Sequence, residues 1–306
     1  MLIASFFWAL RHPLGKIIVK TVHPFQLGTG TLVTGFFGLL VFLVITGRIK
    51  AIKKIPLKDI LLSLGLGVFG FFLYQVFVFS ALERITSSMN AVLISVNVVF
   101  ISILSYIILK EKIKIAGIIG IILAFIGVVL VTFNNGFSDV EGFNIIDIPG
   151  VVFSLLAALS FALYSVLGKK ILKRNDPLIV TAISLFSGTT LLAIFTAGTV
   201  GYSGLFSSGW YNLLLIAILG LTVTAIAYPL WFTCLKNLPA SHVSIYIYIT
   251  PVFAVIISLV VLKEFFSWLF WVGSALIIAG IIITNRFSSA APGSIDRALK
   301  KDSANR

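Results

Sequence analysis

The chain has 306 residues, of which 59% are hydrophobic and only 11% are charged. Soluble domains carry about 25% charged residues, so this composition excludes an ordinary soluble fold and indicates a chain that lives in lipid. The single cysteine, Cys234, excludes internal disulfides and cysteine metal clusters.

Ten apolar segments follow one another along the chain, each close to the length of about 20 residues that a membrane-spanning helix needs. They cover residues 2–21, 25–46, 58–80, 86–108, 113–133, 149–171, 177–199, 210–234, 240–262 and 266–285. The last residues, 287–306, are polar and rich in small side chains, which is typical of a disordered tail. The pattern predicts an all-α integral membrane protein with ten transmembrane helices.

Lysine and arginine gather on one side of this predicted topology. If the N-terminus is cytoplasmic, 18 of the 23 basic residues face the cytoplasm, and the acidic loop with Asp139, Glu141 and Asp147 faces outward. Cytoplasmic loops carry an excess of Lys and Arg in membrane proteins. We therefore expect both termini in the cytoplasm of a cell-membrane protein. The net charge of +13 is interpreted as a topology signal rather than as a surface for nucleic acid.

The chain contains an internal duplication. The segment Ser87–Glu111 recurs as Ala240–Glu264, at an offset of 240 − 87 = 153 residues, with 9 of 25 positions identical. The same offset relates Pro24 to Pro177, Gly35 to Gly188, Gly67 to Gly220, Gly120 to Gly273, and Gly127 to Gly280. Because each copy holds an odd number of helices, the copies are expected to run in opposite directions through the membrane, as inverted repeats of five helices each. The predicted domains are a first repeat at 1–136, an extracytoplasmic linker at 137–149, a second repeat at 150–286 and a disordered cytoplasmic tail at 287–306.

Several short motifs occur in a familiar order. They are Trp8-Ala9, Gly15-Lys16, Ala81-Leu82, Cys234-Leu235, Thr250-Pro251-Val252-Phe253 and the Leu-Lys-Glu endings at 109–111 and 262–264. With these motifs, residues 1–286 resemble a ten-helix EamA-type transporter of the drug/metabolite transporter superfamily. The resemblance implies a secondary transporter that works by alternating access, an exporter or exchanger of a small polar metabolite such as an amino acid or an organic anion. It also implies that helices one, three, four, six, eight and nine line the cavity.

Arg11 is the first candidate substrate-binding residue. It lies about 15 Å along the first predicted helix, at a rise of about 1.5 Å per residue. A charge at that depth is costly and usually faces a cavity or a partner. The predicted spans offer Arg11 no obvious acidic partner, which leaves room for an anionic substrate group. The alternative is that Arg11 extends toward the lipid headgroups or bonds a helix-end carbonyl. The neighbouring His12 is a second candidate substrate-binding residue that could titrate, with helix packing as its alternative. Pro13 is expected to kink the helix and help gating.

Further candidates are polar or aromatic residues within the predicted spans. The candidate substrate-binding residues are Trp8, Tyr74, Gln75, Asn97, Tyr164, Tyr228, Tyr246 and Thr250, and Pro251 joins Pro13 as a candidate gating residue. His242, Tyr246 and Thr250 recur every four residues and predict a polar stripe on the ninth helix. The copies differ at these positions, which predicts an asymmetric ligand with one charged end and one apolar or aromatic end. Interhelical hydrogen bonding and aromatic packing remain alternatives for each residue.

Enzyme motifs are absent from the sequence. It contains no HExxH and no phosphate-binding GxxxxGK, so we expect no catalytic residues, no metal and no cofactor. The expected partners are the lipid bilayer and a small-molecule substrate, with no nucleic acid. The chain is expected to be a monomer or a homodimer, in which the glycines at 120, 127, 273 and 280 are one option for the contact. A membrane-embedded enzyme or a lipid-handling protein is the alternative, and a nucleophile and base facing one cavity would favour it.

Overall fold

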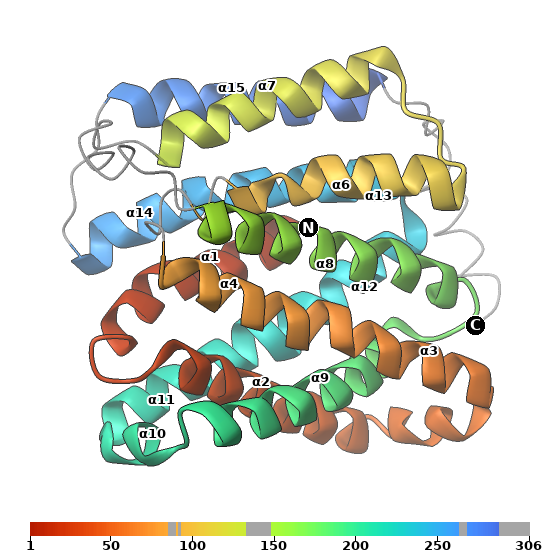
Figure 1. Cartoon of the computed structure of the whole chain (residues 1–306). Helices are drawn as coiled ribbons and strands as arrows, with labels where there is room; N and C mark the ends of the chain where they lie inside the picture. Colours follow the sequence, from red (N-terminus) through yellow and green to blue (C-terminus); the bar gives the residue numbers. More distant parts are fainter. Residues whose placement is uncertain (85–89, 91–92, 133–147, 263–267, 288–306) are drawn as a thin grey trace.

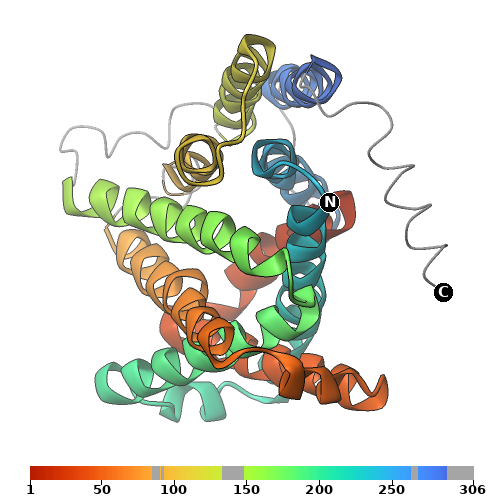
Figure 2. The same cartoon turned by 90° about the vertical axis from the view of Figure 1, so that its right-hand side faces the viewer.

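The computed structural model describes residues 1–84, 90, 93–132, 148–262 and 268–287, and within these residues every regular element is a helix (Figure 1). The all-α prediction is therefore confirmed. Most helices run roughly from left to right in Figure 1, and Figure 2 shows that their axes are tilted relative to one another.

The first part of the chain builds one series of helices. Its elements are α1 (Leu2–Ile18), α2 (Pro24–Ile45), the 3-10 helix η1 (Arg48–Lys54), α3 (Leu57–Gly67), the π-helical segment η2 (Val68–Leu73), α4 (Tyr74–Leu82), α6 (Asn97–Leu104), the π-helical segment η3 (Ser105–Leu109) and α7 (Ile115–Thr132). The chain runs without a break from α3 through η2 into α4, and from α6 into η3.

The second part repeats this order. Its elements are α8 (Ile148–Leu172), α9 (Pro177–Thr199), α10 (Ser203–Ser207), α11 (Trp210–Leu219), the π-helical segment η5 (Gly220–Ile226), α12 (Ala227–Asn237), α13 (Ala240–Ser244), the 3-10 helix η6 (Ile245–Ile249), α14 (Thr250–Leu262) and α15 (Trp268–Phe287). In each part the third long helix contains a π-helical segment, and η2 and η5 overlap at the 153-residue offset because 68 + 153 = 221.

The starts of α2 and α9 show how the sequence encodes these helices. Pro24 and Pro177 each begin the helix, where a missing N–H costs nothing. The preceding residue caps it: His23 Nδ1 accepts a hydrogen bond from the Phe25 N–H over 3.2 Å, and Asp176 Oδ1 accepts one from the Leu178 N–H over 2.8 Å. A polar cap followed by proline is a local signal that fixes a helix start.

Glycines bring the two series of helices into close contact. A Cβ atom on Gly35 would lie 2.8 Å from the carbonyl oxygen of Gly220, and one on Gly188 would lie 2.6 Å from that of Gly67. The two pairs occupy equivalent positions in the two parts of the chain, because the 153-residue offset relates Gly35 to Gly188 and Gly67 to Gly220. The contact between α2 and η5 thus has the same chemistry as the contact between α9 and the end of α3.

The helices α7 and α15 meet in the same reciprocal way. Gly120 faces the Gly280 carbonyl and Gly127 faces the Gly273 carbonyl, and the 153-residue offset exchanges these two contacts as well. Figures 1 and 2 both show α7 and α15 side by side at one edge of the bundle. The four glycines thus bring α7 and α15 together within one chain, and the expectation of a monomer or a homodimer stays a prediction.

The lengths of the helices give fewer full spans than expected. Five described helical stretches are long and apolar enough to cross a membrane, namely Pro24–Ile45, Leu57–Leu82, Ile148–Leu172, Pro177–Thr199 and Trp210–Asn237. Shorter apolar helices cover Leu93–Leu109, Ile115–Val131, Ala240–Ala254 and Trp268–Thr284, and α1 has 17 residues. These stretches fall within or overlap the ten predicted segments, but the count of ten complete spans stays a prediction.

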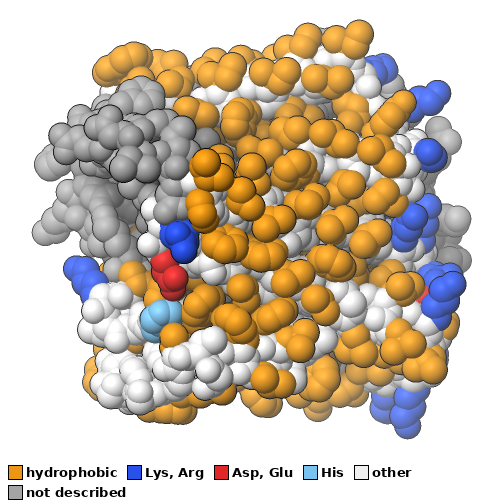
Figure 3. Space-filling view, in the orientation of Figure 1, with side chains coloured by type: hydrophobic (Ala, Val, Ile, Leu, Met, Phe, Trp, Pro, Cys, Tyr) orange, Lys and Arg blue, Asp and Glu red, His pale blue; other side chains and the backbone are white. Residues whose placement is uncertain are grey.

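The surface has the polarity that a bilayer requires. Figure 3 shows hydrophobic side chains over most of the described face of the bundle, with most of the visible Lys and Arg along the edge where η1 and the start of α3 lie. Exposed side chains of α7 include Ile115, Ile118 and Ile122. A wide apolar belt bounded by charges matches the hydrocarbon layer between its polar interfaces.

Ion pairs connect elements at this basic end. Lys169 Nζ lies 2.6 Å from Glu111 Oε1, and Glu111 Oε2 accepts a hydrogen bond from the Ala240 N–H over 2.8 Å. Arg48 pairs with Asp176 over 3.4 Å. These contacts join the end of α8 to the residues after η3 and to the start of α13.

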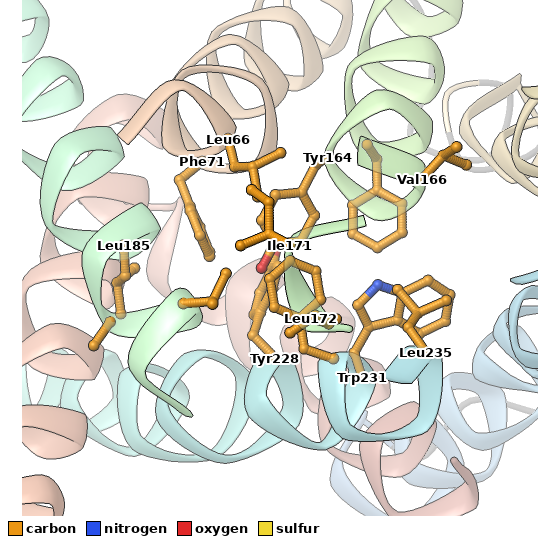
Figure 4. Packing of buried hydrophobic residues seen from close by; sticks show 14 of the residues in the cluster. Leu66, Phe71, Tyr164, Val166, Ile171, Leu172, Leu185, Tyr228, Trp231 and Leu235 are labelled. Atoms are coloured by element: carbon orange, nitrogen blue, oxygen red, sulfur yellow. The ribbon is translucent and has the colours of Figure 1, made fainter. Parts of the chain in front are cut away.

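The main core lies between α8, α12 and the η2 segment and is rich in aromatic rings (Figure 4). Tyr164 stacks on Phe232 with ring centres 4.6 Å apart, and Tyr228 lies 4.6 Å from Phe71. The Trp231 Nε1–H donates to Ser165 Oγ over 3.2 Å. The aromatic residues therefore fill the space between the two parts of the chain.

Candidate functional site

Arg11 lies inside the bundle rather than at its end. Its Nη2 donates a hydrogen bond to Gln75 Oε1 over 2.6 Å, and its Cζ lies 5.8 Å from the centre of the Phe79 ring. Gln75 and Phe79 are one turn apart on α4, so both face α1. This position agrees with the expectation that Arg11 faces a cavity or a partner.

A narrow cavity opens beside the guanidinium. It is lined by Arg11, Thr31, Leu32, Gln75, Leu219, Val223, Thr224 and Tyr228. These residues come from α1, α2, α4, α11, η5 and α12, so both parts of the chain contribute walls. The enclosed space is close to that of one water molecule, which is the smallest cavity that can hold water. In this conformation the cavity is therefore nearly closed.

Tyr228 lines the cavity beside Arg11, and Trp8, which is not part of the lining, packs against it, so the two rings form an aromatic wall. The Trp8 ring lies 5.7 Å from Tyr228, 6.0 Å from Phe161 and 5.6 Å from Trp231. The Trp8 Nε1–H is buried and has no hydrogen-bond partner among the described residues. Tyr74 contacts the same group, with its ring 5.7 Å from Phe161. Aromatic faces near a cation can hold the apolar part of a ligand.

Tyr164 has a different environment from the other predicted aromatic residues. It is fully buried, and its ring lies 5.4 Å from Phe71 and 6.1 Å from Tyr228 (Figure 4). A Cβ on Gly70 would lie 2.3 Å from the Tyr164 ring, so the backbone of η2 also covers it. Tyr164 packs behind Tyr228 and does not line the cavity beside Arg11.

The predicted polar residues of the fourth and ninth helices also lie away from this cavity. Asn97 is the first residue of α6 and Thr250 the first of α14, and both are buried. Asn97 Oδ1 and Thr250 Oγ1 have no hydrogen-bond partner within the described part of the chain. Tyr246 is half-buried, and its backbone carbonyl accepts a hydrogen bond from Ser5 Oγ over 2.9 Å. Their proposed substrate contacts stay predictions.

The ninth helix is not a single α-helix, which changes the expected polar stripe. Residues Ile245–Ile249 wind as a 3-10 helix between α13 and α14. A 3-10 helix has about 3.0 residues per turn instead of 3.6, so His242, Tyr246 and Thr250 do not stay on one α-helical face. His242 and Thr250 are buried and Tyr246 is half-buried, so all three avoid the surface, and their polar stripe stays a prediction.

The predicted gating residues occupy two kinds of position. Pro13 is buried and lies within α1, where it leaves the carbonyl of Ala9 without the usual helical donor. Pro251 is the second residue of α14, in a first turn that tolerates proline. The departure from α-helical geometry in the ninth helix lies before Pro251, in the 3-10 segment η6. The side chain of His12 lies outside the described part of the structure.

Two cavity residues, Thr31 and Thr224, were not among the candidates. Thr31 lies on the second helix, which the family resemblance did not place around the cavity. Thr224 precedes Tyr228 by four residues, so the helical period could have found it. The described residues contain no group of His, Cys, Asp or Glu that could hold a metal ion.

Comparison with known proteins gives a consistent result. The sequence model of the EamA-like transporter family matches residues 1–133 and 148–286. An uncharacterized transporter of Archaeoglobus fulgidus is 30% identical over 283 residues, covering 92% of this chain and 95% of the relative. The uncharacterized transporter YetK of Bacillus subtilis is 30% identical over 275 residues, covering 88% of this chain and 81% of YetK.

A solved structure shares the fold. It is titled "Crystal structure of protein" and superposes with a TM-score of 0.75 over 94% of this chain and 96% of that chain, at 19% sequence identity. This likeness extends over nearly the whole length of both chains.

Proposed function

The chain belongs to the EamA-like transporter family, and on this premise we propose that it is a secondary transporter of a small polar metabolite with an anionic group, such as an amino acid or an organic anion. It works as an exporter or exchanger in the cell membrane, by alternating access.

The reciprocal helix contacts support an inverted-repeat mechanism. Adding 153 exchanges the contact of Gly35 with Gly220 for that of Gly188 with Gly67. A pseudo-two-fold relation between two repeats, 1–136 and 150–286, accounts for such an exchange. With five helices in each repeat the repeats are inverted, and either end of the central site can close while the other opens. The basic end then faces the cytoplasm, together with both termini.

The observation that carries the proposal is the position of Arg11. Its guanidinium lines a cavity between the two parts of the chain, and it donates a hydrogen bond to the neutral Gln75. Buried charges in membrane helices are expensive and mark substrate or ion pathways. An anionic substrate group would compensate this charge. No carboxylate lines the cavity within the part of the chain that the structure describes, so we propose exchange or facilitated diffusion rather than a carboxylate proton relay.

The small size of the cavity supports the proposal of alternating access. A space for about one water molecule cannot hold a metabolite, so the walls must separate before a substrate enters. The aromatic wall of Trp8 and Tyr228 is suited to the apolar part of the substrate, and Arg11 to its anionic end.

Uptake into proteoliposomes tests the role of Arg11. Arg11→Ala removes a charge-assisted hydrogen bond that contributes about 1.5–3 kcal/mol, so the half-saturation concentration for an anionic substrate should rise about 10- to 100-fold. Arg11→Lys should recover part of the loss, because lysine keeps the charge without the planar fork of donors. Lys53→Ala is the matched control, since it removes one positive charge from an exposed residue of η1. Unchanged transport of anions by Arg11→Ala would disprove this role.

A further inference from the structure

Gln75 is the neutral partner of a half-buried charge in the middle of α1. Its Oε1 accepts the Arg11 Nη2–H over 2.6 Å, and only 3% of the residue is exposed. Among the described residues no Asp or Glu pairs with Arg11. A carboxylate would bind the guanidinium more strongly than an amide does. Replacing Gln75 with glutamate would therefore turn this hydrogen bond into an ion pair.

Among the described residues that line the cavity, Arg11 alone is charged. Besides Arg11 and Gln75, the polar side chains are the hydroxyls of Thr31, Thr224 and Tyr228. Thr31 Oγ1 donates to the Gly28 carbonyl over 2.9 Å. A guanidinium has five N–H donors and no acceptor, and an amide adds two more donors. The site therefore offers mostly donors to a ligand.

We infer that Gln75 is a neutral stand-in for the substrate: it accepts the Arg11 hydrogen bond until an anionic group of the substrate replaces Gln75. The substrate of this site is an organic monoanion without an ammonium group. This inference rests on the proposed function and narrows its substrate class. One guanidinium balances one negative charge. An ammonium group would find no carboxylate on the wall and would lie close to Arg11, where like charges repel.

The choice of glutamine over glutamate fits this role. A glutamate at 75 would neutralise Arg11 permanently and compete with every anionic substrate. A functional site is often less stable than it could be, because its groups are kept for a ligand. Gln75→Glu should therefore make the empty protein more stable and the transporter inactive.

The first test measures melting temperature and anion uptake for the same variant. Gln75→Glu should raise the melting temperature of the detergent-solubilised full chain by a few degrees and lower anion uptake at least tenfold. The matched control is Gln26→Glu, since Gln26 is also only 3% exposed but donates its amide to the Gly201 carbonyl over 3.0 Å. A carboxylate at 26 would face that carbonyl without a cation and should lower the melting temperature.

A double-mutant cycle tests whether the rise in melting temperature depends on Arg11. In the Arg11→Gln background, Gln75→Glu should no longer raise the melting temperature, because the partner charge is gone. The stand-in inference is wrong if Gln75→Glu lowers the melting temperature in the wild-type background, or if this variant keeps wild-type uptake of anions.

The second test compares acids that differ only at one group. Wild-type proteoliposomes should take up phenyllactate at least about tenfold faster than phenylalanine, because the hydroxyl replaces the ammonium group. Equal or faster uptake of phenylalanine contradicts the monoanion class while leaving a transporter of anionic groups in place. Wild-type vesicles that move no hydroxy acid and no amino acid contradict the proposed function itself, whatever the melting temperatures.

Discussion

At the scale of single residues, equivalent positions in the two parts of the chain form a polar contact, once between charged groups and once between neutral groups. Asp59 in α3 is fully buried and accepts hydrogen bonds from Arg174 Nε over 2.7 Å and from Asn175 Nδ2 over 2.8 Å. The 153-residue offset relates Asp59 to Asn212 and Arg174 to Thr21, and Asn212 Nδ2 donates to Thr21 Oγ1 over 2.9 Å. The bundle thus has a charge-assisted contact at its basic end and a neutral one at the other end.

The two contacts should differ in their effect on stability. Asp59→Asn turns an acceptor of charged donors into an amide and should lower the free energy of unfolding by about 1.5–3 kcal/mol. Asn212→Ala removes a neutral hydrogen bond and should cost about 0.5–1 kcal/mol. Thermal unfolding of both variants in detergent measures this difference. Equal losses would show that the charge contributes nothing to the basic end.

At the scale of elements, the packing of α7 on α15 depends on the absence of side chains. A Cβ on Gly127 would lie 2.5 Å from the Gly273 carbonyl oxygen. Such a contact is shorter than van der Waals distance and involves backbone, which cannot turn away. Small residues let helices approach closely in lipid, where packing rather than the hydrophobic effect drives association.

A pair of identical substitutions isolates this effect. Gly127→Ala should separate α7 from α15 and cost about 1–3 kcal/mol through overpacking. Gly65→Ala is the control, because Gly65 lies within α3 and a Cβ there meets nothing within 4 Å. Alanine is the better helix former by up to about 1 kcal/mol, so the control should be neutral or stabilising. Melting temperatures check both, and a destabilised Gly65→Ala with an unaffected Gly127→Ala would refute the contact.

At the scale of the whole molecule, the two ends of the bundle differ in charge. Lys54 in η1 is exposed at the basic end, whereas Ser207 in α10 is exposed at the other end (Figure 1). Positively charged loops remain in the cytoplasm, so the topology proposed for this chain puts Lys54 inside the cell and Ser207 outside.

Labelling of single cysteines tests this orientation. In a Cys234→Ser background, Ser207→Cys should react with a membrane-impermeant maleimide in intact cells. Lys54→Cys should react only after the cells are permeabilised, because the membrane protects the cytoplasmic end. The reverse pattern would show that the basic end faces outward.

The sequence predicted much of the architecture because its signals are local or periodic. Long apolar runs determined helices, and the pair of Pro24 and Pro177 marked equivalent helix starts. The depth of Arg11 along its helix identified a costly charge, and the helical period could also have identified Thr224. The offset of 153 residues related the glycines that meet in the fold, although it could not say which glycine meets which.

The tertiary structure alone decided which partners those residues have. Contacts between residues far apart in sequence depend on how helices pack, and no local pattern specifies that Arg11 meets Gln75, 64 residues away. The same holds for Thr31, which lines the cavity from a helix the sequence did not favour, and for Tyr164, which a neighbouring ring and backbone bury. The windings of η2, η5 and η6 also escaped prediction, because packing against neighbours can outweigh the small energy difference between helical forms. The sequence therefore determined that Arg11 places a cation within a predicted span, and only the packing of the helices determined that the neutral Gln75 accepts its hydrogen bond.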